Sequence, residues 1–361
     1  MFYYDVYIYG IKQRINFLLQ FNAFLKENNY NLIFYEIRYD HGPHLQIVFS
    51  KHSNTIKQYI KDKLTNMEDE DKETIDYTKY EKLVKRVIFL KKDKNNPLPL
   101  FKNYTLNYGK IQSIEREKFP DSFLDDKHEM TNFLIKSMDY YYSLPNNTKS
   151  TFLLKLMIIF PKKHLREGIF YSYYSFKSHY EGFKKVLTQM NWEKDKFELI
   201  NKKINIINTS EKEFIFHGFS EFLKETKNDF CDISNKDKII FKEFKLSVYN
   251  TRRSYEKLFN DKMINIKDKD KLKAYLNQSN EISDYHKKLK MRFKYSMFDS
   301  QDFVVGRLMM NWFYSILPFY SLSTIDKYKL CHLICLSVEN YLQKDENEML
   351  DLLEHEYSDK F

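Results

Sequence analysis

The stretch from Phe34 to Phe49, FYEIRYDHGPHLQIVF, places two runs rich in aromatic and β-branched residues on either side of the sequence DHGP at residues 40–43. Runs of this composition around a Gly-Pro turn are typical of a β-hairpin. Side-chain alternation along the two strands would bring four polar groups together near the turn: Arg38, His41, His44 and Gln46. The hairpin is therefore the first candidate for a functional site.

Apolar periodicity extends this hairpin into a small sheet at the start of the chain. We expect strands at 2–9, 31–39, 44–50 and 101–111, and helices at 11–27 and 52–64. After residue 120, apolar residues recur at helical spacing almost to the end, and 7 Gly and 7 Pro in 361 residues are too few for a turn-dense β-sandwich. The sequence predicts an α+β fold that is predominantly helical with a small antiparallel N-terminal sheet.

Three segments of the first part are less regular. Residues 77–90 fit a helix or a strand, the acidic tract 66–76 is typical of an exposed loop, and a turn is expected at 107–109. A boundary near residue 120 separates a sheet-containing part, 1–120, from a helical part, 121–361, and we expect the two to pack as one continuous unit. An open sheet edge within 77–111 would let an extended peptide add as a further strand.

Composition excludes several classes of protein. The net charge of +9 comes from 59 basic and 50 acidic residues that are scattered rather than clustered, which fits a solvated surface or an acidic partner. No alternation of arginine with aromatic residues supports a nucleic-acid module. Three cysteines and the absence of a signal-peptide pattern favour a reduced, cytoplasmic chain, and the most apolar stretch, 304–320, contains Arg307 and is too short to span a membrane.

Motifs for metal or cofactor chemistry are also missing. No phosphate-binding glycine loop and no G-x-S-x-G nucleophile motif occurs. His41 and His44 flank a Gly-Pro turn without a third ligand nearby in the sequence, so a zinc site is not expected. Cys331, His332 and Cys335 lie in an apolar segment that is typical of core packing. We expect neither a metal nor a cofactor.

The hairpin sequence IRYDHGPHL at residues 37–45 resembles the start of the C-terminal elimination domain of lantibiotic dehydratases, which also occurs as free-standing thiopeptide-biosynthesis proteins. Members of this family carry Arg-Tyr, a short turn and Pro-His-Leu-Arg-x-Arg. Weaker similarity follows in three further segments: Ile114–Glu117, Ser172–Phe183 and Val304–Phe313. The resemblance implies a family fold that covers nearly the whole chain.

Departures from the family pattern steer the functional expectation. The two arginines that bind the departing glutamate in eliminases are replaced here by Gln46 and Val48, and the histidine and arginine of the late helix by Arg307 and Trp312. The resemblance is therefore closest to the stand-alone pyridine synthases of this family, which join two dehydroalanines in a formal aza-cycloaddition and expel water and the leader peptide. An eliminase that uses other residues and a non-catalytic peptide-binding partner of a modification complex stay open as alternatives.

The resemblance implies two groups of site residues. The catalytic residues would be His44, Tyr314 and Arg307, and the substrate-binding residues Arg38, Tyr39, His41, Gln46, Glu117 and Asn311. His44 and Tyr314 would exchange protons with the substrate, and Arg307 would bind a peptide carbonyl. The expected partners are a modified precursor peptide, whose leader would dock along the sheet edge within 77–111, and other enzymes that modify ribosomally made peptides.

Overall fold

The computed structural model describes residues 1–71, 74–91, 98–110, 121–161, 168–189, 194–230, 235–262, 282–292 and 300–358. These residues form two compact units. Unit 1 contains Met1–Asp139 and Pro318–Ser321, and unit 2 contains Tyr140–Leu317 and Leu322–Phe361. The chain thus leaves unit 1 once, returns for four residues, and ends in unit 2.

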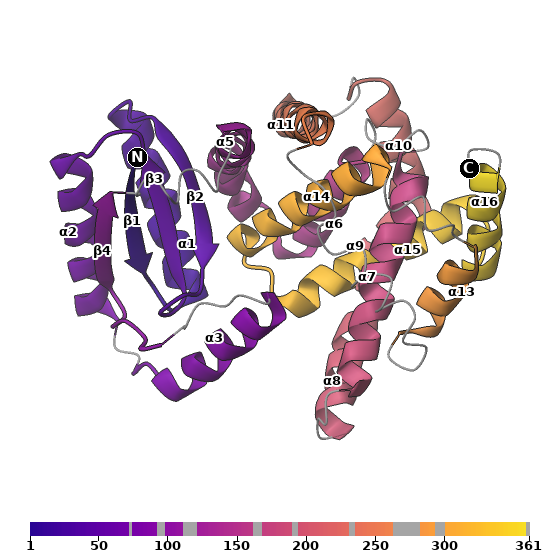
Figure 1. Ribbon diagram of the computed structural model, residues 1–361, viewed down its shortest axis with the longest axis horizontal. Coiled ribbons are helices and arrows are strands. Elements are labelled where there is room, and N and C mark those ends of the chain that lie inside the picture. Colours follow the sequence, from indigo (N-terminus) through magenta and orange to yellow (C-terminus); the bar gives the residue numbers. More distant parts are fainter. Residues whose placement is uncertain are drawn as a thin grey trace. The chain divides into compact units, whose positions relative to one another are not determined.

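Unit 1 is built on a four-stranded antiparallel sheet with the strand order β2-β3-β1-β4 (Figure 1). The strands are β1 (Phe2–Tyr7), β2 (Leu32–Arg38), β3 (His44–Phe49) and β4 (Thr105–Lys110). Its helices are α1 (Ile11–Glu27), α2 (Asn54–Glu70), α3 (Tyr77–Lys91) and α5 (Asp121–Ser143). The hairpin predicted from residues 34–49 is confirmed as β2 and β3. β2 is an edge strand of the sheet, and β3 lies between β2 and β1.

One face of the sheet forms the core of unit 1. Tyr4 and Phe49 pack edge to face at 5.9 Å between ring centroids, and Phe21 of α1 reaches Phe49 at 6.4 Å. The hydroxyl of Tyr4 donates to the carbonyl of Ser53, the residue that caps α2. Large apolar and aromatic side chains at alternate strand positions therefore bury this face beneath α1 and α2.

Three local expectations for unit 1 are resolved by the structure. Residues 77–91 are helical, and α2 continues into the acidic tract as far as Glu70, where a loop was expected. The prediction of a turn at 107–109 is wrong, because these residues lie inside β4. Gly109 is needed there for space: a Cβ at this position would lie 2.9 Å from the hydroxyl of Tyr3, its cross-strand partner on β1. A glycine that resembled a turn signal is therefore a packing requirement of a strand.

Unit 2 is helical. Its helices are α6 (Lys149–Ile159), α7 (Ile169–Gln189), α8 (Lys194–Asn205), α9 (Thr209–Glu213), α10 (Phe219–Lys227), α11 (Asn235–Asn260), α13 (Asp284–Arg292), α14 (Gln301–Ile316), α15 (Thr324–Leu342) and α16 (Glu346–Ser358). A π-helical turn, Phe214–Gly218, joins α9 to α10, and short 3₁₀ segments are found at Asn146–Thr148 and Leu317–Tyr320.

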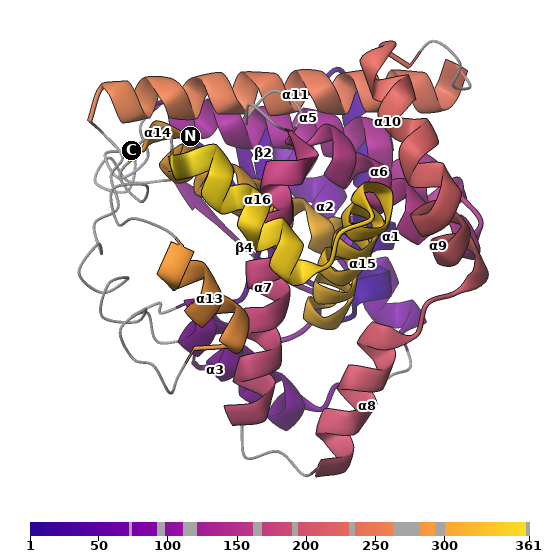
Figure 2. The ribbon, with the colours of Figure 1, turned by 90° about the vertical axis from the view of Figure 1, so that its right-hand side faces the viewer.

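The centre of unit 2 is the packing of α15 along α7 (Figure 2). Cys331 and Cys335 are buried in this interface, as expected for an apolar segment, and the ring of His332 stacks on Tyr180 at 4.5 Å. Phe183 of α7 stacks on Tyr328 of α15 at 3.9 Å. The aromatic stripe of α7 is thus largely structural, and it fixes the register of the two helices.

The predicted fold class is confirmed. The described chain is mostly helical and carries a four-stranded antiparallel sheet at its N-terminal end. Within the described ranges, no helix combines the length and the apolar character that crossing a membrane requires.

Candidate functional site

Polar side chains gather on the sheet face of unit 1 that does not contact α1 and α2. The register pairs Glu36 with Gln46 across β2 and β3, and Gln46 with Asp5 across β3 and β1. Arg38 and His44 form the next pair toward the turn. Cross-strand partners, and residues two apart along a strand, share one face of an antiparallel sheet. The sheet itself therefore brings the predicted hairpin residues together.

Hydrogen bonds link these side chains into a chain. Arg38 donates from Nε to Oδ1 of Asp40 at 3.0 Å and from Nη1 to Oε1 of Gln46 at 3.1 Å. Gln46 donates from Nε2 to Oδ1 of Asp5 at 3.0 Å. The Arg38 side chain remains 35% exposed. Gln46 therefore holds the guanidinium in place, and part of it is left available to a ligand.

His44 is wholly buried in this face. Its Nδ1 lies 2.9 Å from the carbonyl of Gly42, its ring packs on Tyr7 at 4.5 Å, and Nε2 lies 3.8 Å from Oδ1 of Asp5. Burial lowers the pKa of His44 to about 4, so the imidazole is neutral at pH 7 and Nδ1 carries the proton that Gly42 accepts. This position suits a group that shapes the hairpin better than one that meets a substrate.

Burial raises the pKa of Asp5 from 3.8 to about 6, so the stability of the fold should depend on pH through this group. Between about pH 4 and pH 6 the folded chain binds a proton that the unfolded chain has lost, so Asp5 lowers stability as pH rises through this window. We expect Asp5→Asn, which can still accept from Gln46, to raise the free energy of unfolding at pH 7.5 by about 1–3 kcal/mol. Urea titrations at pH 7.5 and pH 4 would measure this gain, which should vanish at pH 4; an equal gain at both values would refute the assignment.

The turn residues are held by internal contacts. His41 and Gly42 have positive φ values of 57° and 120°, and a Cβ on residue 42 would lie 2.4 Å from the hydroxyl of Tyr9, so glycine is required there. Nδ1 of His41 lies 3.0 Å from the carbonyl of Pro99. Tyr39 hydrogen bonds to the buried Arg14. Glu117 and the segment Ile114–Glu117 lie outside the described residues.

In unit 2, α14 presents the other predicted residues along one side. Arg307, Asn311 and Tyr314 follow at intervals of four and three residues, which places them on one helix face. Arg307 and Asn311 are exposed, and neither makes a side-chain hydrogen bond or ion pair with the described part of the chain. Arg307 and Asn311 are therefore accessible to a ligand.

The structure adds two residues that sequence reasoning missed. The ring of His179 on α7 stands edge-on to Tyr314 at 5.0 Å, and Nζ of Lys327 on α15 lies 4.8 Å from the centroid of the same ring. The Tyr314 hydroxyl shares a hydrogen bond of 3.3 Å with the thiol of Cys331. We call Arg307, Asn311, Tyr314, His179 and Lys327 the α14 cluster.

Electrostatics set the protonation states in the α14 cluster. Burial, reinforced by the charges of Lys327 and Arg307, lowers the pKa of His179 to about 3. Burial also raises the pKa of Tyr314 well above 10. At neutral pH the cluster therefore combines a neutral imidazole, a protonated phenol and two cations that can bind carbonyl oxygens.

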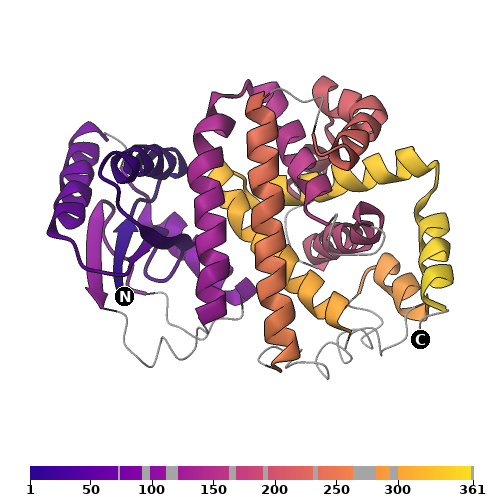
Figure 3. The ribbon, with the colours of Figure 1, turned by 90° about the horizontal axis from the view of Figure 1, so that it is seen from above.

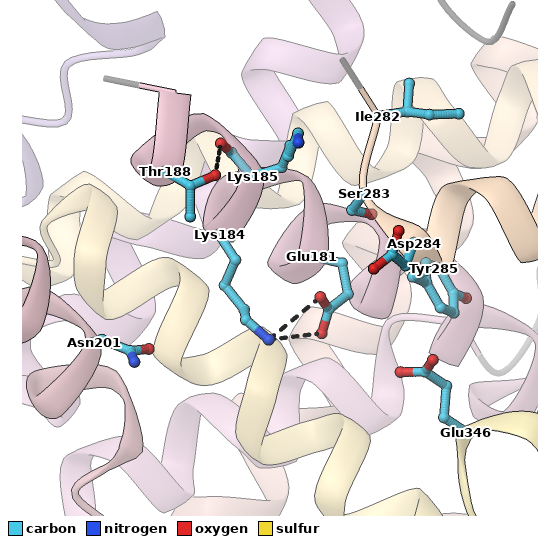
Figure 4. A pocket seen from close by; sticks show the side chains of 10 residues that line it. All are labelled: Glu181, Lys184, Lys185, Thr188, Asn201, Ile282, Ser283, Asp284, Tyr285 and Glu346. Atoms are coloured by element: carbon cyan, nitrogen blue, oxygen red, sulfur yellow. Dashed lines mark hydrogen bonds and ion pairs between the residues drawn. The ribbon is translucent and has the colours of Figure 1, made fainter. Parts of the chain in front are cut away.

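A separate pocket of about 330 Å³ opens near the C-terminal half of α7 (Figure 4). Its lining comes from α7, α8, the start of α13 and the start of α16: Glu181, Lys184, Lys185, Thr188, Asn201, Ile282, Ser283, Asp284, Tyr285 and Glu346. The three carboxylates are already paired: Glu181 with Lys184 at 3.4 Å, Asp284 with Lys287 at 2.8 Å and Glu346 with Lys177 at 3.2 Å. The pocket is thus a polar hollow with balanced charges, and α7 contributes both to it and to the α14 cluster.

Comparison with known proteins rests on structure. No family model and no curated protein matches the sequence. Among solved structures, the pyridine synthase TbtD from thiomuracin biosynthesis superposes with a TM-score of 0.60 at 14% identity, over 94% of this chain and 97% of that chain. TsrL superposes with a TM-score of 0.60 at 12% identity, over 96% of this chain and 97% of that one. The chain therefore has the fold of a thiopeptide pyridine synthase along nearly its whole length, as the hairpin resemblance implied.

Proposed function

We propose that this chain is a pyridine synthase of thiopeptide maturation. The observation that carries the proposal is the α14 cluster: a phenol, a neutral imidazole and two cations meet in a chain whose fold matches TbtD over nearly its full length. The substrate would be a precursor peptide that carries two dehydroalanines and a leader. The reaction forms two C–C bonds, one between the methylene carbons of the two dehydroalanines and one between the former carbonyl carbon and the Cα of the second dehydroalanine. Loss of water and of the leader peptide then makes the ring aromatic.

The cluster residues can divide this chemistry among them. Ring formation needs a peptide amide to adopt its iminol form, which requires one proton to leave nitrogen and one to reach oxygen. Tyr314 would donate to the carbonyl oxygen and His179 would accept from nitrogen, while Arg307 and Asn311 hold neighbouring peptide groups. Holding the two alkenes in contact supplies a further large share of the rate. In the later loss of water, the proton that His179 accepted can leave with the hydroxyl group. A proton lost from a ring carbon in the same step then restores the phenol of Tyr314.

The hairpin residues take a supporting role in this proposal. His44, the second proton carrier expected from the sequence, has no exposed surface and is engaged with Gly42, so we assign it to positioning the hairpin and assign proton acceptance to His179. Arg38, Gln46, Tyr39 and His41 would position the peptide on unit 1. The two carboxylate-binding arginines of eliminases remain absent at Gln46 and Val48.

The leader peptide is proposed to pair with the outer edge of β4. The opposite edge of the sheet is covered: the amide of Tyr35 donates to Thr131 of α5 at 3.2 Å, and His128 of α5 lies 2.9 Å from the carbonyl of Ile33. β4 is the other edge strand, and Asn107 and Tyr108 on it are exposed. An extended peptide could pair as a fifth strand with the backbone groups of β4 that no described strand uses.

Proline substitution tests this edge. Successive backbone amides of a strand point in opposite directions. One of the two substitutions Asn107→Pro and Tyr108→Pro therefore removes an amide that points toward β1, and the other removes an amide on the outer edge of the sheet. Only the variant that loses the outer-edge amide should be as stable as the wild type. In a fluorescence anisotropy titration with labelled leader peptide, we expect that variant to bind about tenfold more weakly. Unchanged affinity in the stable variant would rule out β4 as the docking edge.

The reaction is tested by incubation of the protein with a linear peptide that carries thiazoles, two dehydroalanines and a leader. Mass spectrometry should show a macrocycle and a released leader. A glutamylated core peptide is the companion substrate: its conversion to dehydroalanine would indicate an eliminase instead. Binding of both peptides without conversion of either would indicate a non-catalytic partner.

A further inference from the structure

The longest helix of unit 2 has an outward face with an unusual composition. α11 spans 26 residues, and its inner side packs into unit 2 through buried residues such as Phe241 and Phe244. Phe244 stacks on Trp312 of α14 at 6.0 Å. Figure 2 shows α11 running lengthwise across the top of the view, and in Figure 3 it lies in front with no other element drawn over its middle. One side of α11 thus packs against the core of unit 2, and the other side is exposed.

Exposed positions on α11 follow at intervals of three or four residues, so they form one stripe. The stripe consists of Lys236, Ile239, Lys242, Leu246, Tyr249, Arg253, Lys257 and Asn260. Its apolar members are more than 40% exposed: Ile239 by 59%, Leu246 by 53% and Tyr249 by 43%. Among the α11 residues whose exposure is described, none of the exposed ones is acidic. We call this stripe the α11 face.

Charges on the α11 face are only partly neutralised within unit 2. Lys242 pairs with Asp229 at 3.2 Å. Arg253 and Lys257 have no side-chain partner in the described part of the chain, whereas Arg252, one residue away on the inner side, is held by Glu256 and Asp302. The arginine that faces the core is therefore paired, and the one that faces outward has no partner among the residues that the structure describes.

We propose that the α11 face docks an acidic amphipathic helix of a protein or peptide partner. Ile239, Leu246 and Tyr249 would receive apolar side chains at helical spacing, and Arg253 and Lys257 would pair with carboxylates. From Ile239 to Arg253, a separation of 14 residues, the face is about 21 Å long, which equals about four turns of a docked helix. This inference is independent of the proposed chemistry.

Charged and apolar side chains alternate along the α11 face, and this favours a protein partner over an acidic membrane or a nucleic acid. A helix that lies on a membrane separates its cations from its apolar side, whereas here Lys242 lies between Ile239 and Leu246 on one stripe and would be drawn into the lipid with them. A nucleic acid would leave Ile239 and Leu246 against phosphates. An acidic helix can satisfy both kinds of side chain at once.

The test uses the full chain and a designed fluorescent probe, a helical peptide with leucines at a/d spacing and glutamates on either side. Anisotropy should report binding that weakens with added salt, and Leu246→Ser and Arg253→Glu should each weaken it about tenfold. The matched control is Lys203→Glu on α8, an equally exposed charge change away from the α11 face, which should bind like the wild type. Circular dichroism confirms that each variant is folded.

Several results would overturn the proposal. These are no binding at about 1 mM probe, equal binding of a lysine-substituted version of the probe, or equal affinity of both α11 variants and the wild type. Tighter binding to vesicles of anionic phospholipid, or to a DNA duplex, would assign the α11 face to those surfaces instead. None of these measurements depends on ring formation, so failure here leaves the proposed function standing, and the reverse also holds.

Discussion

Replacement of Tyr314 by phenylalanine is expected to slow pyridine formation by about 100-fold or more, because it removes the proton donor and, besides that, only the hydrogen bond to Cys331. The hydroxyl lies 3.3 Å from the thiol of Cys331, and its pKa is raised well above 10 by burial, so it stays protonated across the neutral range. His179→Ala should cause a loss of similar size. The double variant should lose little more than either single variant, because the two residues act on one proton transfer.

Tyr328 provides the matched control for this prediction. It is a second phenol on the same side of unit 2, stacked on Phe183 at 3.9 Å and contacted by the same Lys327 at 4.2 Å. Tyr328→Phe should leave the rate within a few-fold of the wild type. The measurement is the single-turnover rate of macrocycle formation, followed by mass spectrometry. Losses under about tenfold for both Tyr314→Phe and His179→Ala would mean that confinement of the alkenes, and not proton transfer, supplies the acceleration.

The same prediction extends to pH. Because burial and nearby cations lower the pKa of His179 to about 3, the imidazole should remain neutral at every pH above about 5. We expect the wild-type rate to be flat from pH 6 to pH 8 rather than to rise with a midpoint near the ordinary histidine value of about 6.5. A midpoint near that value, lost in His179→Ala, would show that this histidine titrates normally.

Replacement of Lys177 by alanine is expected to lower the free energy of unfolding by about 3–5 kcal/mol. Nζ of Lys177 on α7 lies 3.1 Å from Glu339 of α15 and 3.2 Å from Glu346 of α16, and its side chain is only 10% exposed. Tyr173 also donates to Glu339 at 2.6 Å. Without the ammonium, Glu339 would lose its cation at a position where its side chain is only 19% exposed, while Glu346 would keep Lys288 at 3.3 Å. Since whole domains are stable by only about 5–15 kcal/mol, such a loss would be large.

Urea denaturation at pH 7.5 measures this effect, and the chain offers two controls. Lys184 on the same helix pairs with Glu181 but is 42% exposed, so Lys184→Ala should cost no more than about 1 kcal/mol. Combining Lys177→Met with Glu339→Gln removes one charge of each sign and should recover part of the loss. Equal destabilisation by Lys177→Ala and Lys184→Ala would show that the buried ion pairs do not hold α7, α15 and α16 together.

The parts of the fold that local rules govern could be predicted from the sequence. The hairpin of β2 and β3 was predictable because its turn needs a glycine at residue 42 and its strands are rich in β-branched and aromatic residues. The helix that carries Arg307 and Tyr314 was predictable because Ser300 caps its start and Pro318 follows its end. Gly109 misled the prediction of β4, because its role is to make room for Tyr3 on a neighbouring strand, which no local pattern reveals.

The candidate site was only half accessible to sequence reasoning. Arg307, Asn311 and Tyr314 share a face of one helix, so their spacing sufficed. His179 and Lys327 belong to two other helices, and their approach to Tyr314 depends on how α7, α14 and α15 pack. The only available signal was a lone histidine within the aromatic helix at residues 172–183, and one lysine among 59 basic residues carries none. Burial of His44 likewise depends on the register of β1 against β3.

The most direct test of the account is a single reconstitution. The purified chain is mixed with a linear peptide bearing a leader, thiazoles and two dehydroalanines, and the products are resolved by mass spectrometry. We predict a macrocycle, formed with loss of one water, together with the intact leader, and neither product with the Tyr314→Phe, His179→Ala double variant on the same timescale. Failure of the wild-type protein to form a macrocycle or release a leader from several such peptides, although it binds them, would contradict the assignment of this chain as a pyridine synthase.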